Sequence, residues 1–335
     1  MIPADVHPKV SEHIPEIIDF IQTLIDKGYA YEADGDVYYS TRKFKDYGLW
    51  KAQKEPDEIA WDSPWGKGRP GWHIECSTMA KKHLGETIDI HGGGQDLQFP
   101  HHENEIAQSE ACNGVPFAKY WMHNGYITVD GVKMSKSLNN FFTVRDIRKD
   151  FTGDFIRFFL LSGHYRSPIN FSDTEMNSVK QGYDRIVTAV ETLEFLTKNG
   201  TDEMSASEKE TLEKLNGHYK EEFIAALEDD LNTALAISVI FEMVTAVNQA
   251  VHESGSKEFA EKALKQIHEL TDVLGILQDA EEDAIGEDIQ ALVEERQQAR
   301  KEKNWARADE IRDALAEKGY TLKDTPQGVQ IIRNN

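Results

Sequence analysis

The chain is organised around one stretch, which reads Ile88-Asp89-Ile90-His91-Gly92-Gly93-Gly94-Gln95-Asp96-Leu97-Gln98-Phe99-Pro100-His101-His102-Glu103-Asn104-Glu105. Apolar and polar residues alternate at its start and three glycines follow, which predicts a short strand ending in a turn where the backbone lies close to a ligand. Pro100 suits the first turn of a helix, because a helix leaves that N–H without a partner. Strand, glycine turn and helix in this order are typical of open α/β sheets, which bind nucleotides at the carboxyl ends of their strands.

Two side chains after the glycines are able to bind a metal ion. His101 and Glu105 are four residues apart and therefore lie on one face of the predicted helix. Both are ordinary zinc ligands, and Cys76 offers a thiolate upstream. Cys76 falls in the first turns of a helix predicted over residues 73–80, where the positive end of the helix dipole favours the thiolate. A solvated His–Glu pair and a small buried cysteine remain the alternative reading.

Composition indicates a soluble globular protein of two or three domains. The chain has 335 residues, more than one core usually supports, and 39% of them are hydrophobic. No apolar run approaches the roughly 18 residues of a membrane span, and the start of the chain lacks the pattern of a signal peptide. Two cysteines give no disulfide framework. We therefore expect a cytoplasmic protein without a membrane partner.

The net charge of −22 argues against a nucleic-acid partner only if the charge is evenly spread. Much of the acid lies between Asp202 and Asp288, whereas Lys and Arg gather at residues 133–149 and again at 296–312. An RNA partner that binds these two basic regions is therefore compatible with the sequence.

The front part of the chain predicts a helix, a hairpin and a loop. Apolar residues recur at three- and four-residue spacing from Ser11 to Gly28, which predicts an amphipathic helix with Ser11 as its N-cap and Gly28 at its end. Residues 29–39 flank a turn-forming cluster and predict a hairpin. Residues 61–72 hold three tryptophans among prolines and glycines, and predict an irregular loop packed by its own aromatic rings.

A lysine-containing loop follows the strand region predicted over residues 120–129. It reads Lys133-Met134-Ser135-Lys136-Ser137. Two lysines among serines are ordinary surface by themselves. A compact cationic loop after a strand is also what a triphosphate site requires, since ammonium groups stabilise negative charge as it develops.

The rest of the chain predicts helices and a small terminal module. Residues 143–161 form a Phe-rich helical region, and Ser172 with Glu175 predicts a capping box that opens a long helix. Further N-caps predict an antiparallel bundle over residues 172 to about 280. From Ile289 onward, two short helices separated near Asn304 and a hairpin predict a small α+β module.

Four of these segments, taken together, resemble cysteinyl-tRNA synthetase, a class I aminoacyl-tRNA synthetase. They occur in that family's order and spacing, and the segments at 306–312 and 324–328 resemble its last domain. The resemblance implies an α/β catalytic part, the second part of a class I Rossmann-like domain, then an all-α bundle and a small α+β module. The implied domains are 1–142 with the zinc site and the lysine loop, 143–171 as a connecting region, 172–282 as a tRNA-binding bundle, and 283–335 as an anticodon-binding module. The four segments are Gly68 to Cys76, His91 to Asp96, Phe99 to Glu105, and Lys133 to Ser137.

The resemblance also implies roles for individual residues. It implies one zinc ion held by Cys76, His101 and Glu105, which would bind the thiolate of the substrate cysteine and select it over serine. By the same resemblance Trp72 and His91 line the cysteine pocket, and Lys133 and Lys136 are catalytic. Lys136 also meets the ATP phosphates, and the remaining residues implied to face ATP are Gly93, Gly94 and Asp96. The implied partners are L-cysteine, ATP with Mg²⁺ and tRNA(Cys), bound by a monomer.

Two departures from the family's pattern are visible. Asn139 stands where the lysine loop usually has glycine, and Asn tolerates a positive φ better than most residues, so the loop can still turn. The family's N-terminal region, with a His-Ile-Gly-His signature and a further zinc cysteine, is not in the sequence. A separate N-terminal fragment would supply both, and water or Cys112 would otherwise complete the zinc ligands.

We therefore expect this polypeptide alone to have little or no adenylation activity, because a set of transition-state contacts would be missing. ATP–pyrophosphate exchange with cysteine is the measurement. Exchange at the rate of a full-length synthetase would contradict this expectation.

Two other functions are compatible with parts of the sequence. A ligase that joins cysteine to an amino sugar in mycothiol synthesis shares the zinc and the lysine loop, but it needs no anticodon-reading module. A non-catalytic tRNA-binding protein would retain the bundle and the basic C-terminal segment. Binding of tRNA without aminoacylation would favour that second alternative.

Overall fold

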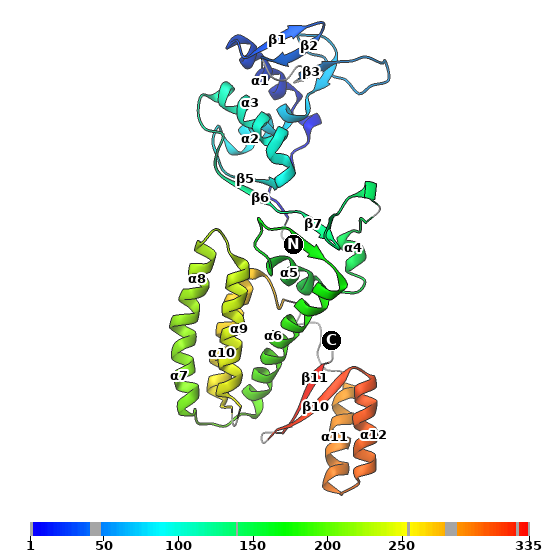
Figure 1. The fold of residues 1–335 in the computed structure, drawn as a ribbon, viewed down its shortest axis with the longest axis vertical. Coiled ribbons are helices and arrows are strands. Elements are labelled where there is room, and N and C mark those ends of the chain that lie inside the picture. Colours follow the sequence, from blue (N-terminus) through cyan, green and yellow to red (C-terminus); the bar gives the residue numbers. More distant parts are fainter. Residues whose placement is uncertain are drawn as a thin grey trace. The chain divides into compact units, whose positions relative to one another are not determined.

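A computed structural model describes residues 3–40, 48–138, 140–252, 255–278, 287–325 and 328–333. It divides the chain into two compact units, residues 1–125 and 126–335, each described here by itself (Figure 1). Asn139 lies outside the described residues, so the departure noted in the lysine loop is not described by the structure.

The first unit opens with a helix and an antiparallel sheet. Helix α1 (Ile14–Asp26) buries the predicted apolar face, and Gly28 ends it with a positive φ of 79°. Ser11 is not its N-cap, because a 3₁₀ turn (Val10–Glu12) precedes the helix and His13 takes the cap position. The sheet has the order β1-β2-β3-β4. Its strands are β1 (Ala30–Ala33), β2 (Asp36–Tyr39), β3 (Gly48–Ala52) and β4 (Gly68–Pro70).

The hairpin predicted over residues 29–39 is confirmed. Strands β1 and β2 pair antiparallel, and the turn residues Asp34 and Gly35 both have positive φ, as a tight hairpin turn requires. The prediction of an irregular loop at residues 61–72 was wrong in part. Gly68–Pro70 forms strand β4 on β3, and Trp61 bridges to Gly68. The segment packs by its aromatic residues as expected, since Trp65 is buried against Trp50.

A parallel pair of strands holds the central stretch. Strand β5 (Ile88–Gly94) pairs with β6 (Ala118–Asn124), and helices α2 (Trp72–Leu84) and α3 (Glu103–Asn113) precede and follow β5. The three glycines continue strand β5 instead of ending it, because Gly92, Gly93 and Gly94 each keep a partner on β6. A 3₁₀ turn (Gln95–Leu97) and a π turn (Gln98–His102) then lead into α3, so Pro100 lies before the regular helix.

The second unit begins with a small sheet and the lysine loop. Its strands have the order β8-β7-β9, with β7 (Ile127–Val129) antiparallel to β8 (Val132–Lys133) and parallel to β9 (Ile169–Phe171). Asp130 and Gly131 turn between β7 and β8 with positive φ. A 3₁₀ turn (Lys136–Leu138) continues the loop, and α4 (Val144–Ile147) and α5 (Gly153–Leu161) make up the predicted helical region.

The bundle is present as predicted, with one large core (Figure 1). Its helices are α6 (Asp173–Asn199), α7 (Ala206–Lys214), α8 (Lys220–Glu228), α9 (Thr233–Ala250) and α10 (Lys257–Leu274), and a π turn (Leu215–Tyr219) joins α7 to α8. Side-chain caps from Ser172, Ser205, Asn232 and Ser256 begin four of them, as the sequence predicts. The phenylalanines of α5 belong to the same core.

Helix α9 is apolar enough to meet the length and hydropathy criteria for a membrane span, with a mean hydropathy of 1.4 over 18 residues. The expectation that no apolar run approaches this length was therefore wrong. Burial explains the composition, because one face of α9, including Ile240, Met243 and Val247, packs in the bundle core.

A buried carboxylate joins two helix starts in the bundle. Glu208 is 1% exposed, and its two oxygens accept hydrogen bonds of 2.7 Å from the backbone N–H groups of Ser205 and Ser256. We expect Glu208→Ala to lower the free energy of unfolding by about 2 kcal/mol, because both N–H groups would lose a charged acceptor. Urea unfolding measures the change. The exposed Glu210, which pairs with Lys214, is the control, and an equal loss on Glu210→Ala would contradict this prediction.

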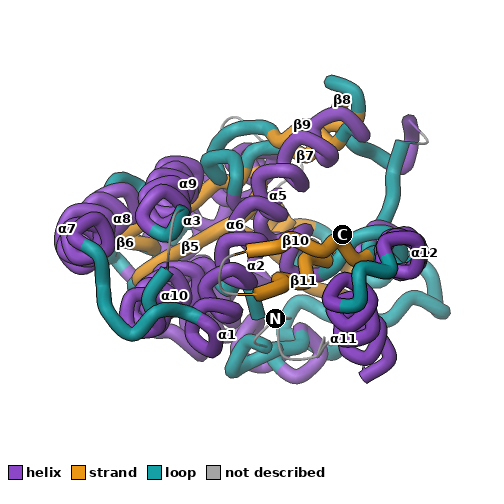
Figure 2. The backbone as a smooth tube through the Cα atoms, turned by 90° about the horizontal axis from the view of Figure 1, so that it is seen from below, coloured by secondary structure: helices purple, strands orange, loops and turns teal. Residues whose placement is uncertain are grey.

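The C-terminal module has the predicted order of helix, helix and hairpin. Helices α11 (Glu287–Lys301) and α12 (Trp305–Glu317) lie beside strands β10 (Tyr320–Thr325) and β11 (Gly328–Arg333) (Figure 2). Asn304 caps α12. A small core forms between the helices and one face of the hairpin, from Ile289, Val293, Ile311 and Leu315.

Candidate active site

The predicted site residues fall in both units. Trp72, Cys76, the glycines and His101 to Glu105 lie in the first unit, and the lysine loop lies in the second. The geometry of each group is therefore described within its own unit.

Glu105 is the centre of the group in the first unit. Its side chain is 5% exposed on the first turn of α3. The carboxylate is in hydrogen-bond contact with the Nε2 atom of His91 on strand β5, and it is close enough to Cys76 on α2 to raise the pKa of that thiol. Three elements thus bring a sulfur, an imidazole and a carboxylate together.

The electrostatic surroundings of Cys76 differ from the expectation. Desolvation of the sulfur by neighbouring atoms, although Cys76 as a residue is exposed, and then the carboxylates of Glu105 and Glu75 raise the pKa of the Cys76 thiol to about 11. The start of α2 was expected to favour the thiolate. Two nearby carboxylates and desolvation outweigh the helix dipole, so the thiol is protonated at neutral pH in these surroundings.

His101 lies against a second histidine. Its ring centroid is 4.9 Å from that of His73, in an edge-to-face arrangement. Burial and the neighbouring His101 lower the pKa of His73, which keeps that imidazole neutral, whereas Glu105 acts in the opposite direction. His73 therefore stands within electrostatic reach of the same carboxylate as Cys76, and His101 lies against His73.

Two histidines that the sequence did not single out also belong to the site. His102 is 4% exposed, and its Nδ1 atom is 2.8 Å from Nε2 of His123 on strand β6. The ligand atoms of His91, His102 and Glu105 all lie within 4.8 Å of one another, so among the described residues these three form the group close enough to hold a metal ion. Of the three ligands that the resemblance implied, this group includes Glu105 but not Cys76 or His101. The signal available in the sequence was the doublet His101-His102 shortly after the glycines, which offered a second imidazole next to the expected ligand.

The glycines allow the strand to approach His102 closely. A Cβ atom at Gly93 would lie 2.7 Å from Cε1 of His102, whereas one at Gly92 would meet its nearest atom at 3.7 Å. Gly94 lies against the carboxylate of Asp96. Trp72 is 74% exposed at the first position of α2, so its ring is open to a ligand.

The lysine loop of the second unit is held by aromatic rings and by one asparagine. Lys133 Nζ lies 4.1 Å from the ring centroid of Tyr126, and Lys136 Nζ lies 5.4 Å from that of Phe141. Asn140 accepts a hydrogen bond of 2.9 Å from the N–H of Ser135 and donates one of 3.2 Å to the carbonyl of Lys133. The loop therefore has a defined shape in which both ammonium groups are near the surface.

The basic residues of the C-terminal module are largely paired with acids. Arg296 and Arg300 both bond to the carboxylate of Asp324, and they lower its pKa. Arg307 pairs with Glu295 and Glu310. Trp305 is 58% exposed at the start of α12. An RNA would meet a mixed surface here instead of a purely basic one.

Relatives of known function cover nearly the whole chain. A cysteine–tRNA ligase from Lachnospira eligens is 52% identical over 99% of this chain and 78% of its own length. The chain belongs to the cysteine–tRNA ligase family. A second cysteine–tRNA ligase, from Clostridioides difficile, is 49% identical over 98% of this chain and 76% of its own length.

Models of known families match three successive parts of the chain. Residues 1–49 and 41–181 match the class I (C) tRNA synthetase catalytic domain, residues 222–278 the DALR domain, and residues 282–333 the cysteinyl-tRNA ligase anticodon binding domain. The α/β part, bundle and terminal module predicted from the sequence are thereby confirmed.

Solved structures agree with this fold at low identity. A protein described as an arginyl-tRNA synthetase from Campylobacter jejuni is similar with a TM-score of 0.60 and 14% identity, over 82% of this chain and 64% of that one. Methionyl-tRNA synthetase from Mycobacterium tuberculosis is similar with a TM-score of 0.55 and 13% identity, over 81% of this chain and 72% of that one. At these identities the likeness concerns the fold alone.

Proposed function

We propose that this chain joins L-cysteine to tRNA(Cys) at the expense of ATP. The observation that carries the proposal is the 52% identity to a cysteine–tRNA ligase over 99% of the chain. Within that chain, the Glu105 carboxylate is close enough to Cys76 to raise the pKa of its thiol. ATP, with Mg²⁺, would activate the cysteine carboxylate as cysteinyl-adenylate, and the terminal ribose of the tRNA would then accept the cysteine.

The donor set fits a zinc ion. A thiol, an imidazole and a carboxylate are the ligand types that zinc takes, and Cys76, His101 and Glu105 supply one of each. Because the pKa of the Cys76 thiol is raised, zinc would have to displace its proton, and a dication next to Glu105 would offset the negative charge that disfavours the thiolate. Bound zinc would recognise the substrate through its sulfur, for which the hydroxyl of serine is a far poorer ligand.

Other residues of the first unit would orient the substrates. His91 contacts the Glu105 carboxylate through Nε2 and lies against Trp121, with ring centroids 4.7 Å apart, and we assign its ring to one side of the proposed cysteine pocket. Trp72 offers an exposed ring as the other wall. Gly93, Gly94 and Asp96 would face the adenosine, where the absence of side chains on the glycines lets a ligand approach the backbone.

The two lysines of the loop would act on the phosphates of ATP. Lys136 is proposed to stabilise the departing pyrophosphate, and Lys133 to support it as a second point charge. In the structure each ammonium group rests on an aromatic ring, an interaction that a triphosphate would outcompete because its charge is far larger.

The second unit would bind the tRNA. We assign residues 143–171 to a connecting region, 172–282 to the bundle and 283–335 to the anticodon-binding module, with 1–142 as the catalytic part. Exposed Trp305 is available for stacking on a base, and basic groups would position phosphates. We further propose that the protein acts in the cytoplasm as a monomer.

The amino-sugar ligase of mycothiol synthesis is the weaker alternative. That reaction has a small-molecule acceptor, whereas residues 282–333 match a domain that binds an anticodon. No observation on the described residues favours an amino-sugar acceptor over a tRNA acceptor.

Two measurements on the 335-residue chain test the proposal. We expect filter binding to retain tRNA(Cys) in preference to a non-cognate tRNA, and any ATP–pyrophosphate exchange to require cysteine and to ignore serine. Exchange supported better by another amino acid would contradict the assignment to cysteine. Binding of tRNA(Cys) with no charging, even with an N-terminal fragment added, would favour the non-catalytic alternative.

A further inference from the structure

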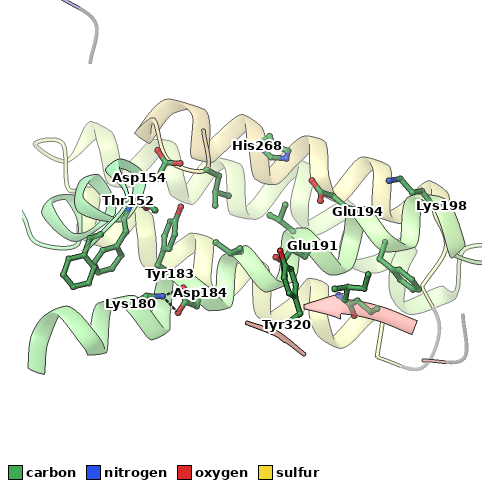
Figure 3. Close-up of a pocket in the computed structure, with 18 of the residues that line it drawn as sticks. Thr152, Asp154, Lys180, Tyr183, Asp184, Glu191, Glu194, Lys198, His268 and Tyr320 are labelled. Atoms are coloured by element: carbon green, nitrogen blue, oxygen red, sulfur yellow. Dashed lines mark hydrogen bonds and ion pairs between the residues drawn. The ribbon is translucent and has the colours of Figure 1, made fainter. Parts of the chain in front are cut away.

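A cleft in the second unit lies outside the proposed catalytic groups. It has a volume of about 590 Å³, and it runs along α6 between the bundle and the terminal hairpin (Figure 3). This volume is in the range of sites for small organic molecules. The reaction proposed above assigns no ligand to it.

The floor and sides of the cleft are apolar and aromatic. Val187 and Val190 of α6 and Leu277 after α10 line it, and the rings of Tyr183 and Tyr320 face it from α6 and from strand β10. Such walls favour the carbon chain of a ligand, and aromatic faces also attract an alkylammonium group.

Carboxylates give the cleft an excess of negative charge. Glu191 and Glu194 are three residues apart on α6, so both lie on the side that lines the cleft, and Glu191 is drawn beside Tyr320 in Figure 3. Two lysines line the cleft, Lys180 and Lys198. Lys180 is paired with Asp184 at 2.8 Å, so these two charges offset each other. The lining acids, which include Asp150 and Asp154, outnumber the lysines.

The wall formed by the hairpin is fixed to α6. Gln330 of β11 is 2% exposed, and its Nε2 atom donates a hydrogen bond of 2.8 Å to Oγ1 of Thr192. A buried side-chain hydrogen bond of this kind sets the spacing of the two walls, because breaking it would leave a buried polar group without its partner. The cleft is therefore a shaped cavity and not a loose gap between elements.

These features select one class of ligand. Anions are repelled by the carboxylates, and an uncharged apolar molecule would desolvate them without compensation. A compact metal ion needs converging ligands, and among the described residues the group close enough for that is His91, His102 and Glu105 of the first unit. Positive charges spaced along a carbon chain match both the acids and the apolar floor. We propose that the cleft binds a linear aliphatic polyamine.

Titration calorimetry with spermidine tests the proposal in 0.15 M salt, where attraction between exposed charges is screened beyond about 8 Å. We expect saturable binding of one spermidine per chain, and a loss of affinity of about tenfold or more in the double variant Glu191→Gln/Glu194→Gln. The matched control is Glu258→Gln/Glu261→Gln, which makes the same charge change at the same spacing on the exposed face of α10. The control is expected to bind like the parent chain.

Three results would overturn the proposal. The first is the absence of saturable binding, and the second is an equal loss of affinity in the control variant. The third is that Mg²⁺ displaces spermidine as effectively as a second polyamine does at the same ionic strength. Thermal unfolding of each variant shows whether it is folded. If the double variant unfolds, the single variant Glu194→Gln at an exposed position takes its place, with Glu261→Gln as control, and equal affinities in the two would again overturn the proposal.

Discussion

Replacing Cys76 by serine is expected to lower the affinity of the chain for zinc by at least about 100-fold, because the variant loses the thiolate ligand. The structure is consistent with this role, because the Glu105 carboxylate is close enough to Cys76 to raise the pKa of its thiol. Elemental analysis and competition with a chelator measure the change. A Co²⁺-loaded sample gives an independent readout, since the thiolate charge-transfer absorption of the parent should vanish in the variant.

The second cysteine is the matched control. Cys112 is 4% exposed in the apolar core of the first unit, with Sγ 3.8 Å from Nζ of Lys81, and it lies two helical turns beyond Glu105 on α3. Cys112→Ser should therefore keep zinc. His102→Ala separates the two metal groups: if it loses zinc while Cys76→Ser retains it, the ion belongs to His91, His102 and Glu105, and the proposed ligand set is wrong.

Replacing Gly71 by alanine is expected to lower the free energy of unfolding of the first unit by more than about 3 kcal/mol. Gly71 is the N-cap of α2, and its N–H donates to the carbonyl of Leu49 at 2.8 Å. A Cβ atom there would overlap the carbonyl oxygen of Gly48 and lie 3.3 Å from Cα of Leu49. Backbone atoms of a strand cannot move aside as a flexible side chain can, so strand β3 and the start of α2 would have to separate.

The loss should appear as a fall of about 10 °C or more in the unfolding temperature of the first unit. Zinc affinity should fall with it, because α2 carries Cys76. Gly92→Ala is the control, since its Cβ would meet the nearest atom, the carbonyl oxygen of Met122, at 3.7 Å. Equal stability of the two variants would contradict the steric account of Gly71.

Regular helices and caps were predictable because their causes are local. The apolar stripe of α1, the hairpin turn at Asp34-Gly35, the capping box of Ser205 with Glu208 and the cap at Asn304 each depend on residues close in the chain. Strand β4 was missed for the opposite reason. Its three residues carry no periodic signal, and they form a strand only because β3 offers a partner edge.

The glycines show how a tertiary partner overrides a local preference. Three glycines in a row favour a turn, but strand β6 lies beside them in parallel and extends β5 as far as Gly94. The predicted close approach of the glycine backbone to a ligand stays a prediction; in the structure the close neighbour of Gly93 is the ring of His102.

The sequence by itself determined the family motifs, the order of the elements and most helix starts, because caps, periodicity and motif residues act over a few positions. Tertiary structure decided which groups meet: Glu105 with both Cys76 and His91, His102 with His123, and α6 with Gln330. It also reversed the expected direction of the Cys76 pKa, since desolvation of the sulfur and the approach of the Glu105 carboxylate depend on the packing of α2 against α3. Charges and ligands act through space, and their distances are fixed only when elements far apart in the chain pack together.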